Sequence, residues 1–433
     1  MSLHDLIFRN GILITPSGPI QGDLAISEGR ISEIGADVSG KAVKEIDLGG
    51  DWLLPGMIDA HVHFNEPGRT DWEGIASGSA AAAAGGVTTV FDMPLNSSPS
   101  LLTPERFREK EAAAKKHSRV KVKLWGGLTP DNLDQLEPLY ECGVIGFKAF
   151  MADSGIDDFA RVDSDSLGKG MEIVAKLPGM RVAVHAEDEA LTARLAAEMT
   201  SAGRCDVNAF LESRPIEAEL IAIREALSLS EQTGCPLHIV HVTSADGLAL
   251  ITGAKGKGID VTAETCPHYL CLTEDDLERL GPLAKCAPPL RNAAEQTKLW
   301  EALCRGEVDT VGSDHSPCPP SMKQGENFAA AWGGISGVQH SLPLLAEGLV
   351  CRGQRIETVA DLVAHAPADI FGLDTGRLEV GFPADLCRLK RAEATVSKSD
   401  LLDRHSHSPY VGTNLSYQVG ATWVDGVNPF ADA

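Results

Sequence analysis

The chain has 433 residues, of which 43% are hydrophobic and 23% charged, as in ordinary soluble globular proteins. This length exceeds the roughly 250–300 residues that one hydrophobic core usually serves, which predicts one large domain and a smaller one. The net charge of −23 excludes nucleic acid and anionic membranes as partners, because both require a basic surface.

In chain order, the first expected elements are short antiparallel strands over residues 5–50, where apolar and polar residues alternate between turn signals such as Arg9-Asn10-Gly11. Residues 376–425 show the same pattern near the other end of the chain. Neither segment is long enough to build a stable core alone. We therefore expect both to pair into one small β-sandwich, with 1–51 and 373–433 as its two parts.

Between these segments, β-rich runs alternate with helical stretches. Eight strands are expected, at Leu53–Phe64, Val87–Met93, Val120–Leu128, Val144–Phe150, Arg181–Glu187, Leu237–Thr243, Asp260–Thr265 and Val308–Asp314. Helices are expected at Gly78–Gly85, Pro104–His117, Ser166–Lys176, Glu217–Gln232 and Ala293–Arg305. Eightfold alternation predicts an α/β protein with a (β/α)8 TIM barrel over residues 52–372. A doubly wound open sheet is the alternative, but no glycine-rich dinucleotide motif follows the first strand.

The first barrel strand ends in Asp59-Ala60-His61-Val62-His63, the most informative stretch of the chain. Residues two apart in a strand project on the same face, so His61 and His63 point to one place. Neutral imidazole is a preferred ligand of zinc, iron, cobalt and nickel. The pair therefore predicts half of a metal site, although taken alone it fits two hydrogen-bonded histidines of an ordinary strand equally well.

Four further strands carry groups that can bind a metal ion near their ends. Lys148 lies near the end of the fourth strand, His185 ends the fifth, His241 is near the end of the sixth, and Asp314 ends the eighth. Working residues of such barrels sit at these carboxyl-terminal strand ends. A lone strand histidine is usually structural, but five such strand ends together predict a metal centre.

Lys148 differs from the others because its side chain is a cation. Flanked by Phe147 and Phe150, it would bury an ammonium, which costs several kcal/mol unless paired and lowers the pKa of the amine. A neutral amine reacts with carbon dioxide to give a carbamate, an anionic ligand able to bridge two metal ions. The alternative is a lysine that extends its ammonium to the barrel mouth. The nearby histidines favour the carbamate.

With these residues the chain resembles the amidohydrolase superfamily, specifically the cyclic amidases: dihydroorotases, hydantoinases and allantoinases. The resemblance covers essentially the whole chain, including the β-sandwich. It implies that His61, His63 and Asp314 hold one divalent ion, that His185 and His241 hold another, and that carboxylated Lys148 bridges them. It leaves His238 to the core or to the surroundings of the ligands, and it implies a homo-oligomer, commonly a tetramer.

Longer motifs look like allantoinase sequence. They are His61–Arg69, Trp72-Glu73-Gly74, Asp92–Asn96, Ser313–Pro320, Trp332–Ile335 and Ser408–Gly412. Dihydroorotases place an arginine two residues after the second histidine to hold the substrate carboxylate; here that position is Asn65, so the clamp is missing. The expected substrate contacts are Asn65, Asn96, Cys286, Ala287, His315 and Gly333.

The resemblance implies that the enzyme opens the hydantoin ring of the small molecule allantoin to give allantoate, in purine breakdown. A metal-bridging hydroxide would be the nucleophile, and Asp314 would act first as general base and then as general acid. A hydantoinase or dihydropyrimidinase shares the metals and differs in the loop after Lys148; a dihydroorotase fits less well. A non-catalytic scaffold is disfavoured because all six ligands are kept.

His and carboxylate ligands do not name the metal: zinc is expected first, with iron, manganese, cobalt or nickel as alternatives. We expect a cytoplasmic protein, because the start of the chain lacks the basic segment of a signal peptide. Its ten cysteines also form no Cys-x-x-Cys pair and sit singly in apolar runs, as reduced thiols do. No apolar stretch reaches the ~20 residues of a membrane span.

Overall fold

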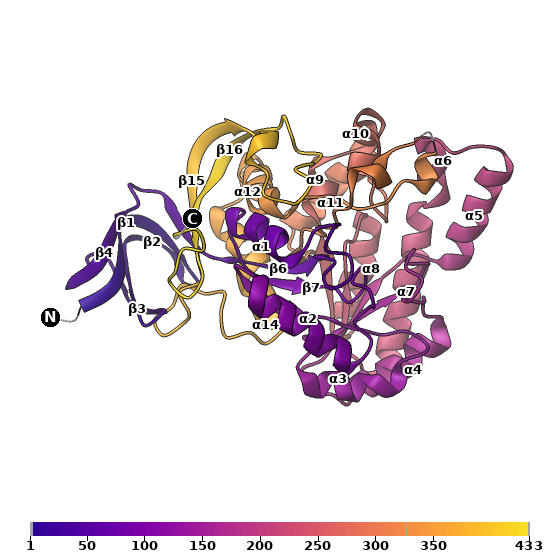
Figure 1. Cartoon of the computed structure of the whole chain (residues 1–433), viewed down its shortest axis with the longest axis horizontal. Coiled ribbons are helices and arrows are strands. Elements are labelled where there is room, and N and C mark those ends of the chain that lie inside the picture. The colour runs from indigo at the N-terminus through magenta and orange to yellow at the C-terminus, as the bar shows by residue number, and fades with distance from the viewer. Residues whose placement is uncertain (1–2, 326, 432–433) are drawn as a thin grey trace.

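The computed structural model describes residues 3–325 and 327–431. It contains a barrel with helices around it and, at one side, a sheet built from both chain ends (Figure 1). None of the described helices is long and apolar enough to cross a membrane.

Eight parallel strand positions form the barrel, as the sequence predicts. The strands are β6 (Met57–Val62), β7 (Val87–Asp92), β8 (Lys121–Leu124) continued by β9 (Gly126–Gly127), β10 (Phe147–Phe150), β11 (Val182–His185), β12 (Leu237–Ile239), β13 (Val261–Thr265) and β14 (Thr310–Val311). Every pairing between them is parallel. A parallel bridge from Val62 to His315 joins the last strand to the first, so the sheet closes into a (β/α)8 barrel.

Helices cover the outside of the barrel, and several others lie in the loops between strands. They are α1 (Ile75–Ala84), α2 (Pro104–His117), α3 (Leu136–Cys142), α4 (Ser164–Val174), α5 (Glu189–Ser201), α6 (Val207–Ser213), α7 (Ile216–Thr233), α8 (Ala245–Lys255), α9 (Pro267–Cys271), α10 (Glu274–Leu280), α11 (Ala293–Cys304), α12 (Ser341–Cys351), α13 (Ile356–Ala360) and α14 (Ala366–Ile370). The five helices expected from the sequence are present within a few residues of their predicted bounds. For α2 the N-cap is Thr103, whose side chain accepts from the backbone N–H of Arg106, with Pro104 at the first helical position.

The two chain ends form one seven-stranded sheet. Its strands are β1 (Leu3–Thr15), β2 (Gly18–Ser27), β3 (Arg30–Gly35), β4 (Lys41–Asp47), β5 (Trp52–Pro55), β15 (Leu386–Thr395) and β16 (Asn414–Trp423). Phe8 and Trp423 meet edge to face at 4.7 Å, so both ends of the chain contribute to one core. The expectation of purely antiparallel strands is wrong in part, because β4 and β5 run parallel to β1.

The predicted strand over Leu53–Phe64 is two strands. Its first residues form β5, which pairs with β1 and β15, and its remainder forms β6 in the barrel. The apolar run is continuous because both pieces are buried. The sheet therefore extends a few residues beyond the expected boundary at residue 51. The division of the chain into domains stays a prediction.

Large side chains fill the barrel beneath its carboxyl-terminal rim. Phe371 packs edge to face on Phe91 at 5.0 Å and on Trp125 at 5.4 Å. The indole N–H of Trp125 donates to the carbonyl of Ala60 at 3.0 Å. The interior is a packed core and not a channel, so polar residues of the strand ends are held at one face of the barrel.

Candidate functional site

The six side chains predicted as metal ligands gather at the carboxyl-terminal rim of the barrel. His61 and His63 lie at the end of β6, Lys148 in β10, His185 at the end of β11, His241 just after β12 and Asp314 just after β14. All six are buried. Parallel strands in a closed barrel end at one rim, which is why these six residues meet there although they are spread over positions 61 to 314.

His61, His63 and Asp314 form the first group. Their ligand atoms lie within 4.8 Å of one another, with Asp314 Oδ1 3.3 Å from His61 Nε2 and 3.4 Å from His63 Nε2. On its other side, His61 Nδ1 lies 2.8 Å from a carboxylate oxygen of Glu264, which is fully buried in β13. The imidazole is thus fixed with Nε2 toward Asp314, an arrangement typical of metal-binding histidines.

His185 and His241 form the second group. His185 Nδ1 lies 3.0 Å from His241 Nε2, and His185 Nε2 lies 2.8 Å from the carboxylate of Glu187. Glu187 in turn accepts a hydrogen bond from Arg214. Burial would raise the pKa of Glu187, but Arg214 and His185 bring it down to about 2, so the carboxylate is ionised. Burial lowers the pKa of both histidines, which are therefore neutral and able to bind a cation.

Two of these ligands have an unusual backbone. His241 has φ 43° and Asp314 has φ 46°, in the left-handed region that residues other than glycine rarely adopt. Such a conformation costs roughly 1–3 kcal/mol and persists only where the surroundings enforce it. Both strains turn a side chain toward the other ligands, which indicates a functional site.

Lys148 lies between the two groups. Its side chain is fully buried, and its Nζ has no hydrogen-bond partner among the residues that the structure describes. The Nζ atom lies 4.9 Å from the ring centroid of Phe150. Burial lowers the pKa of this amine to about 7, against the opposing charges of Asp314 and Glu264. Near neutral pH, Lys148 is therefore a neutral, nucleophilic amine in a substantial share of the molecules.

This donor set fits divalent metal ions. Imidazoles and a carboxylate face one point, and Glu264 and Glu187 hold the far nitrogens of His61 and His185. The unpartnered Nζ of Lys148 is the one group that does not suit a cation as it stands. The group of His61, His63 and Asp314 could hold an ion as it stands. For Lys148 to link that ion to a second one at His185 and His241, its side chain would have to become an anion.

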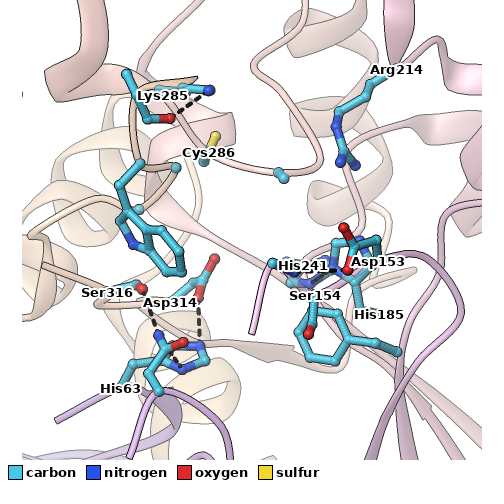
Figure 2. Close-up of a pocket in the computed structure, with 18 of the residues that line it drawn as sticks. His63, Asp153, Ser154, His185, Arg214, His241, Lys285, Cys286, Asp314 and Ser316 are labelled. Atoms are coloured by element: carbon cyan, nitrogen blue, oxygen red, sulfur yellow. Dashed lines mark hydrogen bonds and ion pairs between the residues drawn. The ribbon is translucent and has the colours of Figure 1, made fainter. Parts of the chain in front are cut away.

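A cavity of about 380 Å³ opens above the ligands (Figure 2). Its wall includes five of the six predicted metal ligands, the loops after β10 and α6, and residues 329–334. Two buried lysines hold this last segment in place. Lys285 Nζ donates to the carbonyls of Phe328, Ala329 and Ala331, and Lys323 Nζ donates to those of Pro282, Trp332 and Gly334.

Four of the six expected substrate contacts line the cavity: Asn96, Cys286, Ala287 and Gly333. The other two, Asn65 and His315, do not. Asn65 is fully buried with φ 63°, which turns its amide toward the carbonyl of Pro317 at 3.3 Å. His315 points behind the rim, where its Nδ1 accepts from the backbone N–H of Gly337 at 3.2 Å.

Sequence reasoning missed the carboxylates that hold the histidines. Glu264 lies inside the buried strand β13, where a charge signals a buried partner, and Glu187 follows His185 by two residues, just after β11 ends. His238, expected in the core or around the ligands, is fully buried with Nε2 3.8 Å from Glu264. Arg214 and Lys285 lie in loops and Lys323 ends the short 3-10 helix Pro320–Lys323, and no spacing pattern ties them to the site.

The amidohydrolase family matches residues 52–428. An allantoinase of Deinococcus radiodurans is 48% identical over 428 residues, covering 98% of this chain and 95% of that one. An allantoinase of Bacillus velezensis is 43% identical, covering 98% and 93%. Among solved structures, the L-hydantoinase (dihydropyrimidinase) of Arthrobacter aurescens superposes with a TM-score of 0.95 at 34% identity, covering 98% and 96% of the two chains.

Proposed function

Because the chain belongs to the amidohydrolase family and its full-length relatives include allantoinases, we propose that it hydrolyses the hydantoin ring of allantoin to give allantoate. The observation that carries the proposal is that five side chains able to bind metal ions line one cavity, while the buried Lys148 has no hydrogen-bond partner among the described residues. Ring opening of a cyclic amide needs an activated water, a stabilised oxyanion and a proton for the leaving nitrogen, and this constellation can supply all three.

We propose that His61, His63 and Asp314 hold one divalent ion, that His185 and His241 hold a second, and that Lys148 bridges them as a carbamate. Zinc is the first candidate. Divalent ions, when bound, lower the pKa of water toward ~7 and polarise a carbonyl oxygen. The carbamate is supported by the lysine's burial, its lowered pKa and its missing hydrogen-bond partner.

Asp314 is the proposed proton carrier. Its Oδ1 faces the two histidines, while the side chain is 12% exposed and its other oxygen points up into the cavity (Figure 2). From this position the carboxylate can accept a proton from the attacking water and return it to the departing ring nitrogen. The strained backbone at Asp314 fixes the direction of that oxygen.

The substrate is small, neutral and rich in N–H and C=O groups, and the cavity wall offers suitable partners. Main chain of Cys286–Ala287 and Gly333–Gly334 lines one side, and the amide of Asn96 lines another. Asn96 is itself placed by its contacts with His63 Nδ1 at 3.4 Å and Ser316 Oγ at 3.5 Å. These groups would hold the ring while leaving the reacting carbonyl above the ligands.

Hydantoinase is the second candidate, favoured by the close superposition on an L-hydantoinase. A turnover panel of allantoin, hydantoin, dihydrouracil and dihydroorotate, with metal analysis of the same sample, separates the candidates. We expect kcat/KM to be highest for allantoin and two metal ions per chain. A chain that hydrolyses hydantoin or dihydrouracil better than allantoin would be a hydantoinase, and comparable dihydroorotate hydrolysis would place it among dihydroorotases.

A tetrameric assembly and a cytoplasmic location are also proposed, on the resemblance and on the cysteine pattern respectively. Sedimentation analysis of the purified chain tests the first. Fractionation of cells that express it tests the second.

A further inference from the structure

Arg214 lies in the cavity wall without a role in the chemistry described above. It follows helix α6, its side chain is 22% exposed, and its guanidinium extends into the cavity on the side of His185 and His241 (Figure 2). Within the described part of the chain, Glu187 is the one hydrogen-bonding and ionic partner of this guanidinium. Arginine has five N–H donors in a planar fork, so most of them remain for a ligand.

Among residues 3–325 and 327–431, the other charged side chains of the wall, apart from the proposed metal ligands, are Lys285 and Asp153. Lys285 donates to three main-chain carbonyls, at 2.8, 3.0 and 2.6 Å, and so has no donor left over. Asp153 is exposed at the mouth, where one carboxylate oxygen accepts from the backbone N–H of Gly155 at 3.2 Å. Arg214 therefore supplies donors to the cavity, and Asp153 supplies an acceptor.

The charge of this wall favours a neutral ligand. Glu187 already balances the positive charge of Arg214, and Asp153 adds a negative charge on the same side, as Figure 2 shows. Lys285 lies on the other side of the cavity, where main-chain carbonyls take up its three donors. A substrate carboxylate would therefore meet a net negative charge on the side of Arg214 and Asp153. A neutral group with a carbonyl oxygen flanked by N–H groups would instead match both side chains, and a ureido group has that pattern.

We propose that Arg214 and Asp153 form a subsite for the ureido substituent of the substrate. Arg214 donates to the ureido oxygen, and Asp153 accepts from a ureido N–H. The inference rests on the proposed function, because the ureido group is what distinguishes allantoin from unsubstituted hydantoin. Arg214 also holds Glu187, which holds His185, so one arginine joins recognition of the substituent to the second histidine pair.

The test separates recognition of the ring from recognition of the substituent. KM for allantoin is measured in the metal-loaded enzyme, together with the inhibition constant Ki of hydantoin against allantoin hydrolysis. Arg214→Gln should raise KM for allantoin about 10- to 100-fold, the effect of one charge-assisted hydrogen bond. Ki of hydantoin should stay within about twofold of wild type, because hydantoin lacks the group that Arg214 binds.

Asp153→Asn is the second variant, and its exposed loop position leaves folding undisturbed. It should raise KM for allantoin about 3- to 10-fold with kcat and Ki of hydantoin unchanged. Arg224→Gln, on the exposed face of α7 and paired with Glu217 far from the wall, is the matched control and should change none of these values. Metal content is measured in every variant.

Each outcome decides one question. If Arg214→Gln raises KM of allantoin and Ki of hydantoin by the same factor, or lowers kcat alone, Arg214 only positions His185 and the subsite does not exist. A dihydroorotate Ki below that of hydantoin, lost in Arg214→Gln, would make the site a carboxylate site and overturn the inference as well. Wild-type enzyme that fails to hydrolyse allantoin refutes the proposed function, and the subsite falls with it.

Discussion

Replacing Glu264 by glutamine tests whether the buried carboxylates create the metal centre. The fully buried Glu264 lies 2.8 Å from His61 Nδ1, and burial, which raises the pKa of the acid, is outweighed by His61 and His238, which bring it to about 2. Glutamine keeps the shape and an acceptor oxygen but removes the charge. Loss of such a ligand-orienting partner typically weakens metal binding 10- to 100-fold, or about 1.4–2.7 kcal/mol.

Zinc binding is measured by competition with a chelator, with stoichiometry from metal analysis. Glu264→Gln should fold and bind the ion of His61, His63 and Asp314 at least tenfold more weakly. Asp385→Asn is the matched control: Asp385 is also buried, lies just before β15 and pairs with Lys121 of β8, so its loss should affect stability but not zinc affinity. Wild-type zinc affinity in Glu264→Gln would refute the reasoning that the carboxylate tunes His61.

Gly312→Ala should also weaken zinc binding, because the added Cβ would lie 2.6 Å from Glu264 Oε2 and 3.1 Å from His61 Cβ. Normal zinc affinity in that variant would mean that Glu264 and His61 can move away from the new Cβ without disturbing the site. Lys148→Ala should lose the second metal ion and nearly all turnover, with partial rescue by added short carboxylic acids, whereas full metal content and activity would exclude a bridging role. Asp314→Asn should keep the fold but lose about 10²–10⁴-fold in kcat, and near-normal turnover would assign the proton transfer to another group. Lys323→Met removes three hydrogen bonds to main-chain carbonyls and should lower the free energy of unfolding by about 2–4 kcal/mol. The variant should also be cleaved faster by proteases within residues 319–334, and an unchanged digestion pattern would contradict this role of Lys323.

The six proposed ligands could be predicted because a rule of the fold links distant residues. Once the alternation of strands and helices predicts a barrel, residues at the ends of different strands must share one rim. His61 and Asp314 are 253 positions apart, yet their ligand atoms lie 3.3 Å apart for this reason. The same rule cannot place residues of the long connections between strands, so neither Arg214 nor Lys323 could be assigned to the cavity wall or its surroundings from the sequence.

Asn65 illustrates where a positional argument fails. The missing arginine two residues after His63 does argue against a carboxylate clamp at this position. The structure adds that the side chain at residue 65 does not face the cavity, because φ 63° turns it toward Pro317. The left-handed backbone of a single residue is a local conformation that strand periodicity does not reveal. Other residues must therefore select the substrate, and the proposed ones are Arg214 and Asp153 in the cavity wall.

The charge around the centre gives an independent reason for the carbamate. Four buried carboxylates surround it: Asp59, Glu187, Glu264 and Asp314. Three of them have lowered pKa values, while burial raises that of Asp59 only to about 6, so near neutral pH all are mostly ionised. Arg214 offsets one charge. With Lys148 as an ammonium, two divalent ions would leave a buried excess of two positive charges, which is costly. With Lys148 as a carbamate, the same two ions bring the balance to zero before a hydroxide binds. Four acids at this depth would therefore suit two cations and an anionic lysine together, and we expect loss of the carbamate to expel an ion rather than leave both in place.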